Sequence, residues 1–222
     1  RTHRLVARAD AFAFDLALVP EKPPAIHGEG GVSQKSAGVG NASHYYSYTR
    51  LATRGRLVLG RDTLAVEGRS WMDHEFSSDR LSATHAGWDW FSVQLDDGTD
   101  LMLYQLRLKS GGIEPNSSGT LIAADGRTRR IAREGFTIGS RGTWRSPHTG
   151  GVYPSSWTVS VPGERLELRL EPVLADQELV VRSMGGIAYW EGAVRITGTH
   201  AGRPVSGQGY VELTGYTGRT PF

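Results

Sequence analysis

The chain has 222 residues, 38% of them hydrophobic, which is enough to bury the core of one large β-domain or two small ones. Its formal net charge is +2 and no basic stripe stands out, which argues against nucleic acid as a partner. The absence of Cys excludes disulfides, thiolate nucleophiles and Cys-ligated zinc, and no apolar run reaches the roughly eighteen residues of a membrane-spanning helix.

Alternation of apolar and polar residues is the dominant pattern along the chain. It predicts strands at 10–19, 44–51, 56–60, 63–68 and 69–77. A stretch rich in Pro, Gly and Ser at 21–43 predicts a long loop. Further on, Asp97-Gly98 predicts a hairpin between strands at 88–96 and 99–109, and Asp125-Gly126 marks another. Short strands between turn signals, with almost no helical period, predict an all-β antiparallel fold.

A Gly- and Ser-rich stretch at 109–118 marks a candidate domain junction, with a long hairpin loop as the alternative. We expect residues 119–222 to hold enough strands for a small closed barrel, and residues 1–110 to hold too few. The chain starts without Met and goes straight into a strand-like pattern. We therefore expect a longer protein, whose earlier strands complete the first barrel.

The densest chemistry lies at residues 68–76, Gly-Arg-Ser-Trp-Met-Asp-His-Glu-Phe. On a strand, Trp71, Asp73 and Glu75 share one face and His74 lies on the other. If that face lines a dry cavity, burial and mutual repulsion raise the pKa of at least one carboxyl. A protonated carboxyl beside an indole is suited to general acid catalysis, so Asp73 and Glu75 are candidate catalytic residues. The alternative is a structural acid paired with an arginine, Arg69 or Arg80.

Aromatic side chains supply candidate walls for that cavity. Trp88 and Trp90 share a face of the next strand, and Tyr104 lies in the strand after it. Such rings suit apolar ligands and favour a transient carbocation. Tyr189, in Tyr189-Trp190-Glu191, repeats the pairing of rings with an acid, although a core Trp beside an edge acid explains that stretch equally well.

His44 opens a Tyr-rich strand and shares a face with Tyr46, so the pair is a candidate for catalysis or for a wall. A metal site from His44, Asp73, His74, Glu75 and His85 is the less favoured alternative, because the histidines lack ligand spacing. We expect no metal and no cofactor. Nucleophile elbows, phosphate loops and dinucleotide fingerprints are absent from the sequence.

These motifs resemble the AttH/CrtC-type family, which includes predicted secreted hydrolases and carotenoid 1,2-hydratases (hydroxyneurosporene synthases). The resemblance is carried by Ser-Trp-Met-Asp-His-Glu-Phe at 70–76, Gly-Trp-Asp-Trp-Phe at 87–91 and Gln-Leu-Asp-Asp-Gly at 94–98. It continues with Tyr-Trp-Glu-Gly at 189–192 and Gly-Tyr-Val-Glu-Leu-Thr-Gly-Tyr at 209–216. Nearly the whole chain is covered.

The resemblance implies two lipocalin-like antiparallel β-barrels, the first one incomplete in this chain. Residues 1–112 would be the later part of the N-terminal domain, and residues 113–222 the C-terminal domain. An upstream export signal, a periplasmic or secreted location and an ABC-transporter component as partner are also implied.

In the hydratase branch, an Asp that aligns with Asp73 is proposed to protonate a C=C bond before water adds. The supporting upstream residues fall on His44 and Tyr46, and Trp71 stands where an aromatic flanks the acid. Two positions differ from that branch, Glu75 in place of Asn and Tyr46 in place of Trp, and both resemble the AttH-type branch. The wider fold group also includes pericyclases.

Three hypotheses follow. The protein is an enzyme, a hydratase or hydrolase that acts on an apolar, isoprenoid- or lipid-like substrate with Asp73 as proton donor. The second hypothesis is a non-catalytic protein that binds a hydrophobic small molecule on behalf of a transporter. The third is a scaffold without a ligand. The first hypothesis requires that Asp73 face a ring-lined, water-poor cavity.

Overall fold

The computed structural model describes residues 2–77, 82–182 and 186–218, and nearly all of its regular structure is antiparallel strand. The strands before residue 80 are β1 His3–Arg8, β2 Phe12–Pro20, β3 Ala25–Ile26, β4 Val32–Gln34, β5 Ala42–Leu59 and β6 Asp62–Phe76. They form one six-stranded sheet in which β5 pairs with β2, β3, β4 and β6. The predicted all-β class is confirmed.

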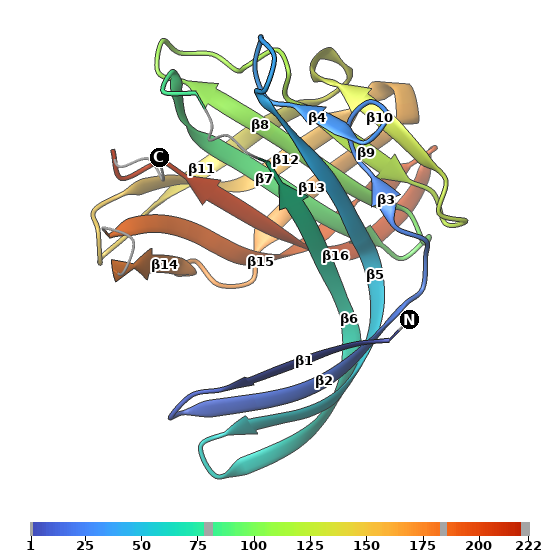
Figure 1. The fold of residues 1–222 in the computed structure, drawn as a ribbon, viewed down its shortest axis with the longest axis vertical. Coiled ribbons are helices and arrows are strands. Elements are labelled where there is room, and N and C mark those ends of the chain that lie inside the picture. The colour runs from blue at the N-terminus through green and yellow to red at the C-terminus, as the bar shows by residue number, and fades with distance from the viewer. Residues whose placement is uncertain (1, 78–81, 183–185, 219–222) are drawn as a thin grey trace.

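The second sheet has ten strands, in the order β10-β9-β8-β7-β16-β15-β13-β12-β11, with β14 added on β15. Its strands are β7 His85–Leu95, β8 Asp100–Leu108, β9 Ser118–Ile122, β10 Thr128–Ala132, β11 Thr137–Arg145, β12 Val152–Val161, β13 Leu166–Pro172, β14 Glu178–Val181, β15 Ile187–His200 and β16 Arg203–Thr214. Single-turn 3-10 helices at Arg133–Gly135 and Pro162–Glu164 lie between strands. The sheet curls into a half-barrel, as expected of a lipocalin-like fold (Figure 1).

The predicted hairpin turns are present. β7 and β8 are joined across Asp97-Gly98, and β9 and β10 across Asp125-Gly126. Gly98 and Gly126 have φ angles of +85° and +86°, a conformation that glycine adopts without steric cost. The sequence pattern therefore located these turns through backbone chemistry.

The change from one sheet to the other falls between β6 and β7, upstream of the predicted domain boundary at residue 112. Residues 109–117 connect the paired strands β8 and β9. β7 and β8 pack on both of their faces, because Phe91 belongs to the main core of the ten-stranded sheet while Trp90 packs against Tyr45 of β5 and its neighbours. The packing therefore allows β7 and β8 to be assigned to the first domain or to the second, and the domain boundary at residue 112 stays a prediction.

The main core lies inside the curled ten-stranded sheet. Its largest fully buried side chains include Trp157, Trp190, Tyr153 and Phe91. Trp157 lies 5.9 Å from the Phe91 ring and 5.7 Å from the Trp190 ring, distances at which tilted rings attract one another. No helix in the described part of the chain has the length and apolar character needed to cross a membrane.

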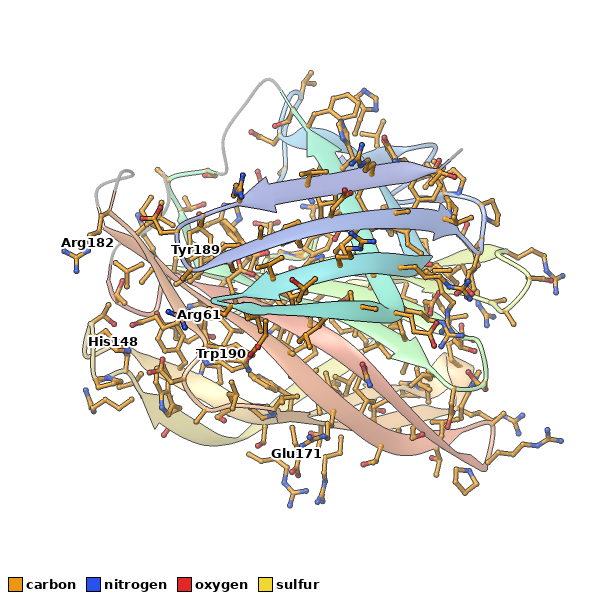
Figure 2. All side chains as sticks on the ribbon, turned by 90° about the horizontal axis from the view of Figure 1, so that it is seen from below. Arg61, His148, Glu171, Arg182, Tyr189 and Trp190 are labelled. Carbon is orange, nitrogen blue, oxygen red and sulfur yellow. The ribbon has the colours of Figure 1, made fainter. Side chains whose placement is uncertain are left out.

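β5 and β6 are long strands of the six-stranded sheet, and one end of each extends away from the ten-stranded sheet to form an arm with β1 and β2 (Figure 1). Figure 2 shows the four arm strands lying side by side. The pairing of β5 with β6 shifts register between Tyr48 and Leu51, which is a β-bulge. Bulges bend a strand, which accounts for the change of direction where the arm begins.

A buried ion cluster ties the base of the arm to the ten-stranded sheet. Asp100 of β8 has no exposed area and binds Lys22 Nζ at 2.7 Å and Arg50 Nη2 at 2.6 Å. The hydroxyl of Thr49, next to the bulge, donates to the same carboxylate at 2.8 Å. Because both cations are almost fully buried, the cluster fixes β5 relative to β8 and so positions the residues between them.

Candidate active site

A cavity of about 350 Å³ lies between β5 and β6 on one side and β7, β8 and β16 on the other. The rings of Tyr45, Trp88, Trp90 and Tyr104 line it, together with Leu106. Three carboxyl groups also line it, from Asp73, Glu75 and Glu212. A ring-lined cavity with a few converging polar groups is the usual form of a small-molecule site.

Asp73 faces this cavity from β6, as the alternation along the strand predicts. Its Oδ1 atom accepts hydrogen bonds from the hydroxyl of Tyr45 at 2.7 Å and from the hydroxyl of Ser47. No hydrogen bond to Oδ2 occurs within the described residues. The carboxyl is therefore held through one oxygen, which leaves the other oxygen for a ligand.

Asp73 is exposed to solvent on the open side of the cavity, while the protein atoms around its carboxyl are dense enough to desolvate the group in part. This partial burial raises its pKa above the usual value, with a smaller upward contribution from the charge of Glu75. Hydrogen bonds from Ser47, Trp71 and Tyr45, in that order of effect, act in the opposite direction, because they stabilise the ionised form. Within residues 2–77, 82–182 and 186–218, no guanidinium group pairs with the carboxyl of Asp73.

Tyr45 links the acid to the aromatic wall. It is 4% exposed, its hydroxyl donates to Asp73, and the same oxygen accepts the indole N–H of Trp90 at 3.0 Å. Burial, followed by the charge of Asp73, raises the pKa of Tyr45 well above its usual range. The phenol therefore stays protonated and acts as a fixed hydrogen-bond donor.

Ser47 connects Asp73 to a buried histidine and then to the ten-stranded sheet. The Nε2 atom of His27 lies 2.8 Å from Ser47 Oγ, and its Nδ1 atom lies 2.8 Å from Thr120 Oγ1. Burial, helped by the charge of Lys35, lowers the pKa of His27 to about 3, so the ring is neutral. Since Ser47 donates to Asp73, it accepts from Nε2–H, and Thr120 donates to Nδ1.

Glu75 has a different environment, although it shares the face of Asp73. It accepts a hydrogen bond from Ser43 and forms an ion pair with Lys35 at 2.6 Å. Lys35 Nζ also lies 4.2 Å from the centre of the Tyr104 ring. The arginine pairing considered from the sequence does not involve Arg69, which bonds to Glu21 at 3.1 Å, and Arg80 lies outside the described residues.

Glu212 of β16 is a functional candidate that the sequence analysis did not select. Its Oε1 accepts the indole N–H of Trp88 at 2.8 Å, and Glu191 lies directly opposite it on β15. Burial, followed by the charge of Glu191, raises the pKa of Glu212 to about 7. The charges of Asp73 and Glu75 act in the same direction, which places all three acids in one electrostatic environment.

The structure places His44 and Tyr46 on the opposite face of β5 from the cavity, in contrast to the expectation from the resemblance. His44 pairs across the strands with Phe76, and Tyr46 stacks on His74 at 5.2 Å. The reason is the register: Ser47 lies opposite Asp73, and directly opposed residues of antiparallel strands share a face. Alternation then brings Tyr45 to the cavity and turns its neighbours away.

The other predicted wall residues lie at or near the cavity. Tyr104 is buried with its hydroxyl bonded to Ser33 and Ser118, so only its ring serves the wall. Trp71 packs edge-on against Trp90 at 6.1 Å, beside Asp73. Tyr189 does not line the cavity and instead supports Trp88 from behind, at 6.2 Å between rings.

The cavity-facing residues of β5 follow a pattern that is visible in the sequence. Ser43, Tyr45 and Ser47 alternate along β5 in step with Asp73 and Glu75 on β6, so small hydroxyl groups mark the cavity face. Glu212 alternates with the apolar residues Val211 and Leu213, which is the ordinary pattern of a half-buried strand and does not set this acid apart. Lys35 comes from the long loop and left no comparable pattern.

Across the described residues, no group of three or more metal-ligating side chains is arranged to hold a metal ion. The family model for AttH-like proteins matches residues 1–216. This chain belongs to the AttH-like family. No curated protein matches it significantly.

Solved structures agree with this assignment. A crystal structure of an AttH protein from Nitrosomonas europaea is 38% identical, with a TM-score of 0.88 over 97% of this AttH-like chain. Kievitone hydratase from Nectria haematococca, at 19% identity and a TM-score of 0.79, and CghA with Sch210972, at 13% and 0.57, share the fold. The chain spans 65% of the Nitrosomonas chain and 64% of the hydratase chain.

Proposed function

We propose that this AttH-like protein adds water to a C=C bond of an apolar, isoprenoid- or lipid-like substrate, or hydrolyses such a substrate, with Asp73 as the proton donor. The observation that carries the proposal is the geometry of the Asp73 carboxyl. Two hydroxyl donors hold Oδ1, Oδ2 has no partner among the described residues, and aromatic rings line the adjoining cavity.

For hydration, the proton on Asp73 Oδ2 passes to one alkene carbon and the π electrons form the new C–H bond. The other carbon becomes cationic, and water attacks it to form the C–O bond. Tyr45 and Ser47 stabilise the carboxylate that remains on Asp73, because both donate to Oδ1. Such positioned proton transfer accelerates a reaction by about 10²- to 10⁴-fold.

The rings of Trp88 and Trp90 support the cationic stage. Their indole N–H groups are bonded to Glu212 and to the Tyr45 hydroxyl, which fixes the orientation of both rings. An indole face attracts a cation through its quadrupole, more strongly where water is excluded. The neutral alkene gains much less from this contact than the cation does, so the rings favour the charged stage over the ground state.

Glu212 completes the proposal as the group that takes the proton lost by the attacking water. With a pKa of about 7, it exchanges a proton near neutral pH. Asp73 and Glu212 together then hold one proton at the start of a cycle and one at its end. Turnover begins from the arrangement in which Asp73 carries that proton and Glu212 is ionised.

The comparisons support the reaction class only in outline. One structural neighbour is named as a hydratase, and the likeness at 19% identity is a likeness of fold. The acid and the rings in this cavity match what the hydration of an alkene requires, which is why the same class is proposed for this chain.

The test is to incubate the purified chain with a panel of apolar alkenes, including terminal isoprenoids and kievitone, in ¹⁸O-labelled water. A product that gains one labelled water is expected with the wild type and absent with Asp73→Asn. The matched control is Asp62→Asn, the same change at the exposed start of β6 on the arm. Equal product from wild type and Asp73→Asn would refute Asp73 as donor.

A non-catalytic binder is the second candidate, favoured by the ion pair between Glu75 and Lys35, which leaves one of the three acids already neutralised. In that case the ligand is carried unchanged, for a transporter after export, as the family resemblance implies. Native mass spectrometry of freshly purified protein would show a co-purified apolar molecule. The same molecule on Asp73→Asn protein, with no product from either, would favour the binder.

A further inference from the structure

A second chamber of about 470 Å³ adjoins the candidate active site, and three residues line both spaces: Asp73, Trp90 and Glu212. We propose that the ligand is an elongated, uncharged amphipathic molecule, with its apolar part in the ring-lined chamber and a neutral hydroxyl- or amide-type head in the second. The inference rests on the proposed function in placing the reacting group beside Asp73. Each volume falls within the roughly 300–1,000 Å³ typical of small-molecule sites.

The two chambers differ in chemistry. The first is lined by Trp88, Tyr104 and Leu106, all on the face of β7 and β8 that packs towards β5. The second chamber has a larger polar share in its lining, from Ser92, Gln94 and Gln208, beside the rings of Trp71, Trp90 and Tyr210. A ligand that spans both chambers needs one apolar end and one hydrogen-bonding end.

Some polar side chains in the second chamber have no protein partner, whereas Gln94 donates to the backbone carbonyl groups of Thr49 and Ser70. Within the described residues, neither the hydroxyl of Ser92 nor the side-chain amide of Gln208 forms a hydrogen bond. The indole nitrogen of Trp71, which lines this chamber only, is buried and acts on the Asp73 carboxyl, whose ionised form it stabilises. Ser92 is a buried residue, so its unpartnered hydroxyl favours a hydrogen-bonding head in this chamber. Gln208 is exposed, so water satisfies its amide until a ligand displaces that water.

Charge selects against an anionic head. The cations at the two chambers are already paired, Lys35 with Glu75 and Arg69 with Glu21. Asp73 and Glu212, which stand between the chambers, have no cationic partner among the described residues. A carboxylate or phosphate head beside them meets uncompensated negative charge in a partly desolvated place.

The test compares monolaurin, dodecanol and laurate, which share an alkyl chain length, by titration calorimetry with the whole chain below their micelle concentrations. Monolaurin is expected to bind at least about tenfold more tightly than laurate. Gln208→Leu should bring monolaurin down towards the affinity of dodecanol, whose own binding stays unchanged. Glu212→Gln should narrow the gap between laurate and monolaurin.

The matched control is Glu171→Gln, the same change on β13, at a carboxylate on the far side of the ten-stranded sheet from the arm (Figure 2). It should alter none of the three affinities. The inference is overturned if laurate binds as tightly as monolaurin, if Gln208→Leu leaves monolaurin binding unchanged, or if none of the three compounds binds. Since the readout is binding, a lack of turnover counts against the proposed function alone.

Discussion

Tyr45 holds Asp73 from the neighbouring strand, with its phenolic oxygen 2.7 Å from Asp73 Oδ1. The same oxygen accepts the indole N–H of Trp90 at 3.0 Å, so one buried hydroxyl orients both the acid and a wall of the cavity. Because the phenol stays protonated, this donor is permanent. This shared hydroxyl explains why the acid and the aromatic wall meet at this point on β6.

Asp73→Asn should abolish turnover while leaving the fold and ligand binding intact. An amide keeps the shape of the side chain and has no acidic proton to deliver, so a loss of about 10²- to 10⁴-fold in kcat is expected. Steady-state kinetics, circular dichroism and calorimetry separate these effects. Asp62→Asn serves as the control, and a similar loss in that variant would point to a general effect of charge.

Tyr45→Phe removes a hydrogen bond that stabilises ionised Asp73, so the pKa of Asp73 should rise further. The acid side of the pH–rate profile, where both Asp73 and Glu212 become protonated, should then move to higher pH. The Trp90 N–H also loses its acceptor, which costs about 1–3 kcal/mol of unfolding free energy. Tyr46→Phe, on the other face of β5, should change neither quantity.

Turnover should fall as pH rises above about 7, because the Asp73–Glu212 pair then loses its single proton. The ionisable groups that act on Glu212 come from β6 and β15 and interact with it through charge: Asp73, Glu75 and Glu191. Glu191→Gln removes one negative charge and should move this falling limb to lower pH. Glu171→Gln is the control. If the high-pH limb of the pH–rate profile has the same midpoint in Glu191→Gln as in the wild type, Glu212 does not set that limb.

Asp100→Asn should destabilise the fold strongly. It leaves Lys22 and Arg50 buried without their counter-charge, and breaking a buried ion pair in this way costs about 3–5 kcal/mol. Urea unfolding measures the loss. Asp15→Asn breaks the exposed pair with Arg4 and should have a far smaller effect, since solvent screens that interaction.

His44→Ala should leave turnover close to that of the wild type, because His44 is exposed and lies across from Phe76 on the face turned away from the cavity. Stability should change by no more than about 0.5 kcal/mol, as for most surface substitutions. Ser43→Ala, one residue away, removes the hydrogen bond to Glu75 and should reduce turnover. A large loss of turnover in His44→Ala, without a loss in Ser43→Ala, would contradict this placement and make His44 a catalytic candidate again.

The strands and turns could be predicted from sequence because their signals are local. Alternation located the strand that carries Asp73, and Asp97-Gly98 located a hairpin through the backbone conformation of its glycine. The break between the sheets could not be predicted from composition. Gly and Ser cluster at 109–118 within the ten-stranded sheet, whereas the change of sheet follows Phe76.

Within one strand, the alternation of side chains was enough to place Asp73 and Glu75 on one face and Trp88 and Trp90 on another. Which residue of β5 lies opposite Asp73 depended on the register between strands, and a shift of one residue exchanges Tyr45 for Tyr46. The approach of Glu212 depended on the pairing of β16 with β7, a contact between distant parts of the chain. Local sequence encodes the direction of a side chain along its own strand, but only the assembled sheets decide which charges meet.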